Sequence, residues 1–220
     1  MRQLFVPISA GRHIYKREPS FPIAVACDPA FNFVYEANIR YLHHLGEVTY
    51  FSPLADTSLP DAGFVYLPGG YPELYLAALS ANRQMLQSIR RYVESGGKLL
   101  AECGGMMYLC DEIRDKNGYV YPMAGVLHQS ATMENMKLRL GYRTLLYNET
   151  RLKGHEFHYS RLVEQQNPLP SCAVAYTAKG VETDTPLYHY KNVWAGYTHL
   201  YWADPVGNEW FTKFVIDGNT

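Results

Sequence analysis

Two alternating hydrophobic patterns run through the first half of the chain. Short continuous apolar runs, typical of buried strands, occupy residues 23–27, 48–51, 64–67 and 98–102. Between them, apolar side chains recur at helical spacing over residues 33–45 and 80–95. Gly46 and Gly96 follow these two segments as stop signals, and Ser80 is the predicted N-cap of the second. Strands that alternate with helices predict an α/β fold with a mostly parallel central sheet and helices on both faces.

The second half of the chain has a different pattern. Short apolar and aromatic runs there predict additional antiparallel strands. These runs cover residues 143–147, 156–159 and 172–176, and a hairpin is predicted from residues 187–190 and 193–197. Residues 205–216 predict a closing helix, and residues 1–20 are irregular and read as a linker. We therefore expect one domain over residues 21–220.

Composition excludes several function classes without identifying one. The chain has 220 residues and a formal net charge of -1, which gives no reason to expect a nucleic-acid or membrane partner. No apolar run approaches the roughly 20 residues that span a bilayer, and residues 1–8 lack signal-peptide features, so a cytoplasmic location is expected. The cysteines form no Cys-x-x-Cys pair, which predicts neither a zinc site nor a disulfide framework. They are Cys27, Cys103, Cys110 and Cys172.

Residues 97–109 carry the clearest chemical signal. An apolar strand leads into Cys103, which is followed by Gly104, Gly105 and a segment that favours helix. This order is typical of a nucleophile elbow, a tight strand-to-helix turn that presents one reactive side chain above a sheet. At a helix N-terminus the backbone dipole lowers a thiol pKa, so we expect Cys103 to be a nucleophile.

A cysteine nucleophile needs a base and donors for the oxyanion. His199 follows a late strand-like run and is the candidate base. The backbone N–H of Gly104 and the loop formed by Gly69 and Gly70, at the end of a neighbouring strand, are the candidate donors.

A metal site is not predicted. His155 and His158 flank Glu156, but residues three apart on a strand point to opposite faces of the sheet, and no third ligand clusters with them. The sequence also lacks a Gly-x-x-x-x-Gly-Lys-Ser/Thr loop for nucleotide phosphates, so no cofactor is expected in this chain.

Four motifs in order resemble the class I (triad) glutamine amidotransferase domain of the cobyrinate a,c-diamide synthase family. They are residues 67–73, 101–108, 154–160 and 199–201. The resemblance, which covers about Pro22 to Trp202, implies that residues 21–220 form a domain that hydrolyses glutamine. By that reading Cys103 forms a γ-glutamyl thioester, His199 moves the protons, and Gly70 and Gly104 stabilise the oxyanion.

The same resemblance implies residues that shape the glutamine site or an interdomain surface. These predicted substrate-binding residues are Gly69, Tyr71, Glu73, Gly105, His155, Glu156, His158 and Tyr159. Many class I amidotransferases carry a glutamate two residues after the histidine, whereas Tyr201 stands there in this chain. The resemblance therefore implies a Cys–His dyad whose histidine is held by another group.

Related amidating enzymes carry an N-terminal ATP-binding synthetase domain. We therefore expect ATP, Mg²⁺ and the corrinoid substrate to belong to such a partner, with residues 1–20 as the remnant of a linker to it. The expected function is ammonia supply for amidation of the a and c carboxylates of cobyrinate in cobalamin biosynthesis. Two alternatives stay open: a catalytically weak docking module, or a glutaminase for another acceptor, such as a different tetrapyrrole or a peptidoglycan stem.

Overall fold

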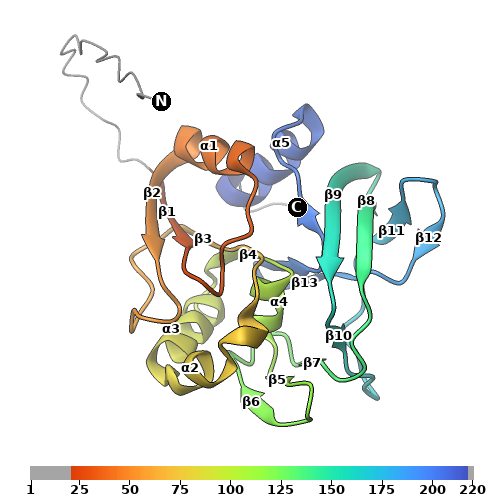
Figure 1. Ribbon diagram of the computed structural model, residues 1–220. Helices are drawn as coiled ribbons and strands as arrows, with labels where there is room; N and C mark the ends of the chain where they lie inside the picture. The colour runs from red at the N-terminus through yellow and green to blue at the C-terminus, as the bar shows by residue number, and fades with distance from the viewer. Residues whose placement is uncertain (1–20, 218–220) are drawn as a thin grey trace, which may run out of the picture.

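A six-stranded sheet lies at the centre of the computed structural model, which describes residues 21–217 (Figure 1). Its strand order is β13-β14-β4-β3-β1-β2, and β13 alone runs antiparallel to its neighbour. The strands are β1 (Phe21–Ala26), β2 (Gly46–Phe51), β3 (Phe64–Leu67), β4 (Lys98–Glu102), β13 (Leu187–Tyr190) and β14 (Val193–Gly196). The predicted mostly parallel sheet is confirmed.

Two apolar layers cover the sheet because successive side chains of a buried strand point to opposite faces. On β3, Val65 and Leu67 belong to the layer formed with helices α3 and α4, whereas Phe64 and Tyr66 belong to the layer formed with α1 and α5. Figure 1 shows these helices on opposite sides of the sheet. The helices are α1 (Glu36–Leu45), α2 (Leu76–Ala81), α3 (Arg83–Glu94), α4 (Gly104–Leu109) and α5 (Pro205–Thr212), with short turns η1 (Pro72–Leu74) and η2 (Lys213–Asp217).

Two smaller sheets are built mainly from the second half of the chain, as predicted. One has the order β12-β11-β8-β9-β15 and lies beside the central sheet in Figure 1. Its strands are β8 (Arg139–Tyr147), β9 (Thr150–His158), β11 (Val174–Thr177), β12 (Glu182–Thr183) and β15 (His199–Leu200). The other has the order β10-β7-β5-β6, formed by β5 (Glu112–Arg114), β6 (Val120–Pro122), β7 (Ser130–Thr132) and β10 (Arg161–Leu162).

Two predicted helix starts were wrong. The first helix begins at Glu36 rather than at residue 33, because the Phe33 N–H donates a hydrogen bond to the Gly69 carbonyl. The segment predicted as one helix over 80–95 contains the last two residues of α2 and all of α3, and Ser80 lies inside α2 instead of capping a helix. The cap of α3 is Asn82, whose side chain accepts a hydrogen bond from the Met85 N–H at 3.3 Å. Residues 1–20, the predicted linker, lie outside the described residues.

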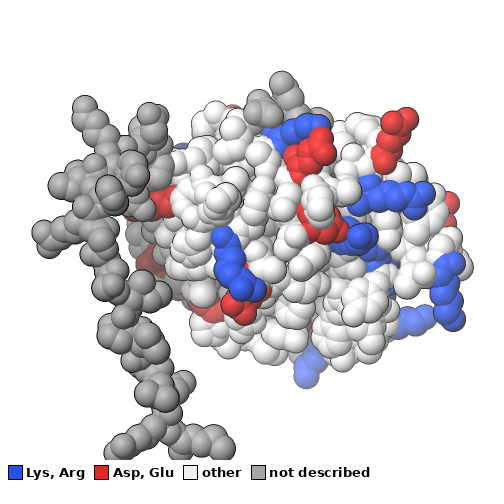
Figure 2. Space-filling model, turned by 90° about the horizontal axis from the view of Figure 1, so that it is seen from above, with Lys and Arg blue, Asp and Glu red and all other residues white. Residues whose placement is uncertain are grey.

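Acidic and basic side chains are interspersed on the face shown in Figure 2, and much of that face is uncharged. Within residues 21–217, no helix is both long enough and apolar enough to cross a membrane.

Candidate active site

Cys103 occupies a strained turn between β4 and α4. Its backbone has φ 49° and ψ -106°, a conformation that residues with a side chain rarely adopt. The Cys103 N–H donates to the Gly196 carbonyl on β14 at 2.7 Å, and the Cys103 carbonyl accepts from the Met107 N–H at 3.0 Å. The strand, turn and helix expected for a nucleophile elbow are therefore present, and hydrogen bonds on both sides hold the turn.

The glycines after Cys103 allow backbone segments to approach each other closely. A Cβ added at Gly105 would lie 2.1 Å from the Leu67 carbonyl oxygen, so this glycine lets α4 pack against β3. A Cβ at Gly104 would lie 2.7 Å from the Pro72 ring and 3.1 Å from the Gly70 carbonyl oxygen. Gly104 and Gly70, the two predicted oxyanion donors, are thus brought together, whereas Gly105 serves helix packing.

The loop of Gly69 and Gly70 contacts both halves of the candidate dyad. A Cβ at Gly69 would lie 2.1 Å from Cε1 of His199, so the imidazole lies directly against this glycine. Gly70 has φ 157° and a Cβ there would lie 2.1 Å from the Ala30 carbonyl oxygen, so only glycine fits. One short loop therefore positions His199 on one side and the Cys103 elbow on the other.

His199 lies on β15, directly opposite His155 of β9, and only 2% of its surface is exposed. The Phe33 ring packs against the imidazole with a centroid distance of 4.3 Å. Asn38 of α1 fixes the segment that follows: its side chain donates to the Leu200 carbonyl at 2.7 Å and accepts from the Trp202 N–H at 2.9 Å. A residue distant in sequence thus sets the path of the chain next to the candidate base.

Replacing Asn38 by Leu is expected to lower the free energy of unfolding by about 2–6 kcal/mol, because two buried backbone groups, on Leu200 and Trp202, lose their partner. Urea denaturation measures this change. Asn32→Ala is the matched control, since the exposed Asn32 amide donates only one long bond, of 3.3 Å, to the Pro29 carbonyl. Equal urea midpoints for the two variants would contradict the role of Asn38 in holding the chain at Leu200 and Trp202.

The cavity beside Cys103 is almost filled by the side chains that line it. Its volume is about 10 Å³, room for about one water molecule. Its lining includes six predicted site residues, Gly70, Tyr71, Glu73, Cys103, His158 and Tyr159, together with Met107, Phe157 and Ser160. The Cys103 Sγ lies 3.8 Å from the Phe157 carbonyl oxygen at the end of β9. Side chains at the mouth must therefore move before a substrate can enter.

The ionisation states at the site differ from the sequence-based expectation. Burial, followed by the charge of Glu73, raises the pKa of Cys103 to about 12, although the Gly104 N–H acts in the opposite direction. The prediction of a lowered thiol pKa was wrong, because burial of the thiol, only 4% exposed, outweighs the Gly104 N–H. Burial lowers the pKa of His199 to about 3. Near pH 7 the pair is a neutral thiol and a neutral imidazole, and in this closed, buried state the imidazole is a weak base.

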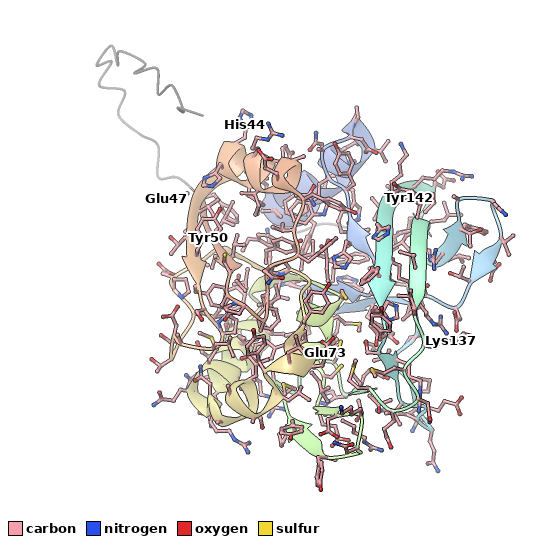
Figure 3. The ribbon with its side chains drawn as sticks, viewed as in Figure 1. His44, Glu47, Tyr50, Glu73, Lys137 and Tyr142 are labelled. Atoms are coloured by element: carbon pink, nitrogen blue, oxygen red, sulfur yellow. The ribbon has the colours of Figure 1, made fainter. Side chains whose placement is uncertain are left out.

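Glu73 is the acidic group that borders the Cys103 cavity. It lies on η1, half-buried, and faces the front of the molecule in Figure 3. Burial raises the pKa of Glu73. Next to it, the exposed Tyr71 forms part of the mouth.

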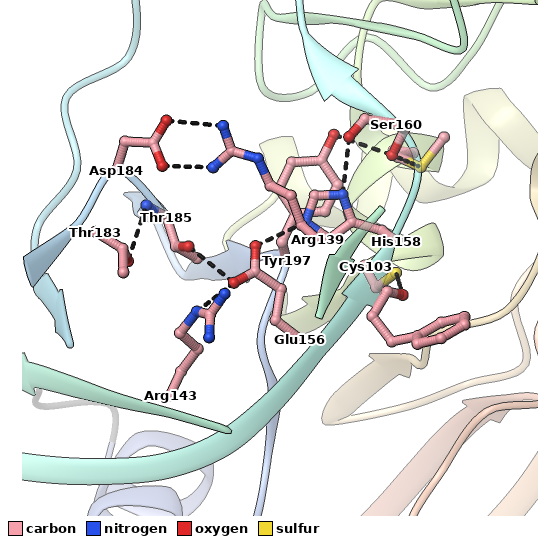
Figure 4. A network of polar contacts seen from close by, with 12 residues as sticks. Cys103, Arg139, Arg143, Glu156, His158, Ser160, Thr183, Asp184, Thr185 and Tyr197 are labelled. Atoms are coloured by element: carbon pink, nitrogen blue, oxygen red, sulfur yellow. Dashed lines mark hydrogen bonds and ion pairs between the residues drawn. The ribbon is translucent and has the colours of Figure 1, made fainter. Parts of the chain in front are cut away.

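A buried polar network supports the end of β9 from behind (Figure 4). Glu156 accepts a hydrogen bond from His158 Nε2 at 2.7 Å and one from the Thr185 hydroxyl at 2.9 Å, and it pairs with Arg143. Burial acts to raise the pKa of Glu156, but the bond to His158 and the charge of Arg143 outweigh it and lower the pKa. His158 also bonds the Ser160 carbonyl at 2.8 Å, so the network fixes the cavity wall.

His155 and Glu156 do not line the Cys103 cavity. His155 lies across from His199, with its ring 5.7 Å from that of Tyr142, and Glu156 belongs to the network on the other face of the sheet. The predicted separation of His155 and His158 onto opposite faces is confirmed. Among residues 21–217, no group of three or more His, Cys, Asp or Glu side chains could hold a metal ion.

Sequence reasoning overlooked Glu102, which precedes Cys103 and is buried. One Glu102 oxygen accepts from the Tyr66 hydroxyl at 2.6 Å, and the other from the Leu200 N–H at 3.0 Å. A carboxylate at the end of an otherwise apolar strand was the available signal, since buried charges are rare without partners. Asn38 had a similar signal, because it interrupts the apolar stripe of Val34, Leu42 and Leu45.

Comparison with known proteins shows one family. Residues 22–206 match the CobB/CobQ-like glutamine amidotransferase domain. The chain is 40% identical over 185 residues to a hydrogenobyrinate a,c-diamide synthase of Pseudomonas aeruginosa, covering 81% of this chain and 41% of the relative. It is 38% identical over 210 residues to a cobyrinate a,c-diamide synthase of Clostridium acetobutylicum, covering 91% of this chain and 46% of the relative. The chain thus spans less than half the length of these curated relatives.

Solved structures support the fold. The structure of PurLQS from Thermotoga maritima aligns with a TM-score of 0.56 at 16% identity, covering 90% of this chain and 96% of the other. A glutamine amidotransferase from the same organism aligns with a TM-score of 0.53 at 12% identity, covering 90% of this chain and 83% of the other.

Proposed function

Because the chain belongs to the CobB/CobQ-like glutamine amidotransferase family, we propose that it hydrolyses the side-chain amide of glutamine with Cys103 as nucleophile and His199 as base. One observation carries the assignment of these residues: the loop of Gly69 and Gly70 lies against both the His199 imidazole and the Cys103 elbow. No other cysteine among residues 21–217 sits in a turn with positive φ.

The proposed reaction has two stages. His199 takes the thiol proton as the Cys103 sulfur attacks the amide carbon, and the N–H groups of Gly70 and Gly104 stabilise the oxyanion. The imidazolium then protonates the leaving nitrogen, and ammonia departs from a γ-glutamyl thioester. In the second stage His199 deprotonates a water molecule that attacks the thioester, and glutamate and the free thiol are released.

We propose that the residues at the cavity mouth recognise the amino-acid end of glutamine. The Glu73 carboxylate is suited to its ammonium group, and Tyr71 and Tyr159 are placed to close over the substrate. His158 lines the cavity and holds its wall, whereas Glu156 acts on substrate only through the wall that it helps to hold. His155, on β9, lies opposite His199 of β15, and we propose that it acts next to the base His199.

Labelling with 6-diazo-5-oxo-norleucine tests this function. Intact mass should show one adduct per chain, and glutamate release should accompany glutamine incubation. A second candidate, a catalytically idle docking module, is favoured by the cavity of about 10 Å³. It predicts neither adduct nor glutamate, with or without a synthetase partner. An adduct that forms only with the partner present would mean that the partner opens the glutaminase site.

The ammonia is proposed to serve an ATP-dependent synthetase portion that holds ATP, Mg²⁺ and a corrinoid substrate. Relatives named for cobyrinate and for hydrogenobyrinate both match this chain at 40% identity, so identity to this domain does not distinguish between those acceptors. We propose amidation of corrinoid a and c carboxylates in the cytoplasm. Another tetrapyrrole or a peptidoglycan stem as acceptor would contradict this assignment.

The synthetase portion is proposed to dock over β8 and the cavity mouth. On β8, Leu140 is 55% exposed and Tyr142 is 73% exposed, and both share the sheet face of His199. Tyr142 is labelled on this strand in Figure 3. Exposed Tyr71 and Tyr159 continue the surface to the Cys103 cavity. Docking there would cover the point where ammonia is released, and more than half of each matched relative lies outside the matched region.

Tyr142→Ser is expected to lower glutamine-dependent amidation at least about tenfold in the assembled enzyme, because it truncates a large exposed aromatic contact. Ammonia-dependent amidation, measured in parallel, should change less than twofold. Tyr119→Ser is the matched control, since Tyr119 is 67% exposed beside β6, outside this surface. Equal losses in both variants would contradict docking at β8.

A further inference from the structure

The buried candidate base has a ring nitrogen without a hydrogen-bond partner. Nδ1 of His199 is inaccessible to solvent and makes no hydrogen bond with the described residues. Leaving a buried polar group unpaired is unfavourable, so a partner is expected at some stage of the reaction. Nδ1 lies 3.9 Å from Oε2 of Glu102, too long for a hydrogen bond but close enough for one to form on a small shift. Catalytic hydrogen bonds often shorten only when substrate binds.

Glu102 is itself held rigidly. The Tyr66 hydroxyl donates to Oε2 and the Leu200 N–H donates to Oε1, so both carboxylate oxygens have fixed donors. These donors come from β3 and from the residue after His199, and Glu102 is 2% exposed. The carboxylate therefore cannot rotate away from the imidazole without breaking two buried hydrogen bonds.

We propose that Glu102 is the positioning residue for His199: it accepts a hydrogen bond from Nδ1–H and leaves the lone pair on Nε2 to take the thiol proton. This inference rests on the proposed function. Tyr201 stands where many class I amidotransferases carry the glutamate that orients the histidine, and it has no carboxylate. The proposal gives the orientation of His199 to Glu102, the residue directly before Cys103. Nucleophile and orienting group then share one strand end, so the geometry of β4 fixes both.

The ionisation of Glu102 gives the proposal a pH signature. Burial raises the pKa of Glu102 to about 8, whereas the bonds from Tyr66 and Leu200 act to lower it. Below this pKa Glu102 carries its own proton; above it, the carboxylate can accept from Nδ1–H. Other titratable groups also act on the pair. The charge of Glu102 acts to raise the pKa of Tyr35, Tyr66 and Cys103, so a substitution at Glu102 affects these three groups as well. His155, His158 and Glu156 act on His199.

Nitrogen NMR of the full chain labelled at histidine tests the proposal directly, with the His199 signal assigned by its loss in His199→Gln. Between pH 6 and 9 the wild-type proton should settle on Nδ1 as Glu102 ionises. In Glu102→Gln, the Leu200 N–H keeps the amide oxygen in place, so the NH₂ group takes the position of Oε2. That group donates to Nδ1, and the proton should move to Nε2.

Kinetics provide the second readout. Glu102→Gln is expected to lower kcat for glutamate release at least about 100-fold with KM within about twofold, since it removes only the orientation of the base. Glu36→Gln, an exposed carboxylate on α1, is the matched control and should retain wild-type kinetics. A kcat within threefold of wild type, or an unchanged tautomer, would overturn the proposal.

Failure of the proposal and failure of the proposed function remain distinguishable. If the wild-type chain releases no glutamate even in the assembled enzyme, the proposed function fails, and the tautomer still decides the role of Glu102. If Glu102→Gln does not fold, the wild-type titration decides alone. A wild-type proton that stays on Nε2 at pH 9 would then contradict the role of Glu102.

Discussion

Cys103→Ala is expected to abolish glutamine hydrolysis, with a fall in kcat of about 10⁴-fold or more, because no other group can form the thioester. Glutamate release and the mass of the 6-diazo-5-oxo-norleucine adduct measure the loss. The backbone should persist, since hydrogen bonds to Gly196 and Met107 hold the turn independently of the thiol. In the assembled enzyme, amidation driven by added ammonia should continue, because that reaction bypasses glutamine.

Cys110→Ala is the matched control for this substitution. Cys110 is fully buried, like Cys103, and burial also raises its pKa, but it lies at the end of α4, away from the cavity lining. It should keep both the adduct and glutamate release. Retained turnover in Cys103→Ala would show that the nucleophile is misassigned. Loss of ammonia-driven amidation in that variant would show that the substitution harms the assembly instead.

Gly69→Ala is expected to lower kcat at least about 100-fold. The new Cβ would lie 2.1 Å from Cε1 of His199, so the imidazole must move by more than 1 Å, and displacements of that size commonly cost about 100-fold in rate. The backbone of Gly69 is not in the left-handed region, so the substitution adds no backbone strain of its own. Glutamate release measures the effect, and the 6-diazo-5-oxo-norleucine adduct should form correspondingly slowly.

Gly180→Ala separates displacement of the base from general destabilisation. Gly180 has φ 76°, which disfavours alanine, but a Cβ there has no atom within 4 Å. This control should lose some stability in thermal melting while keeping wild-type kcat. If Gly69→Ala keeps more than about a third of the wild-type kcat, the imidazole lying against Gly69 is not the base.

Local sequence signals located the strands on either side of the Cys103 turn and the glycine loop well. The bounds of β3 and β4 follow from continuous apolar runs ended by Pro68 and Cys103, and these strands were predicted to the residue. Helix starts were less predictable. Phe33 is not helical, because its N–H donates a hydrogen bond to the carbonyl of Gly69, a residue distant in sequence. Separation in sequence also explains why Asn82 was not predicted as the cap of α3. Its amide donates to the Pro53 and Asp56 carbonyls, and no local sequence pattern reveals these contacts.

The sequence by itself determined the α/β layout, the elbow at Cys103 and the glycine loop at the end of β3, because these depend on local hydrophobic runs and on glycine's freedom from side-chain clashes. Only the tertiary structure decided the electrostatics. Burial raises the pKa of Cys103, whereas the sequence predicted a lowered pKa. The tertiary fold also brings Glu102 close to His199 and places Glu156 in a polar network behind the cavity. These outcomes depend on which side chains from distant strands exclude water, and that is a property of packing rather than of sequence order.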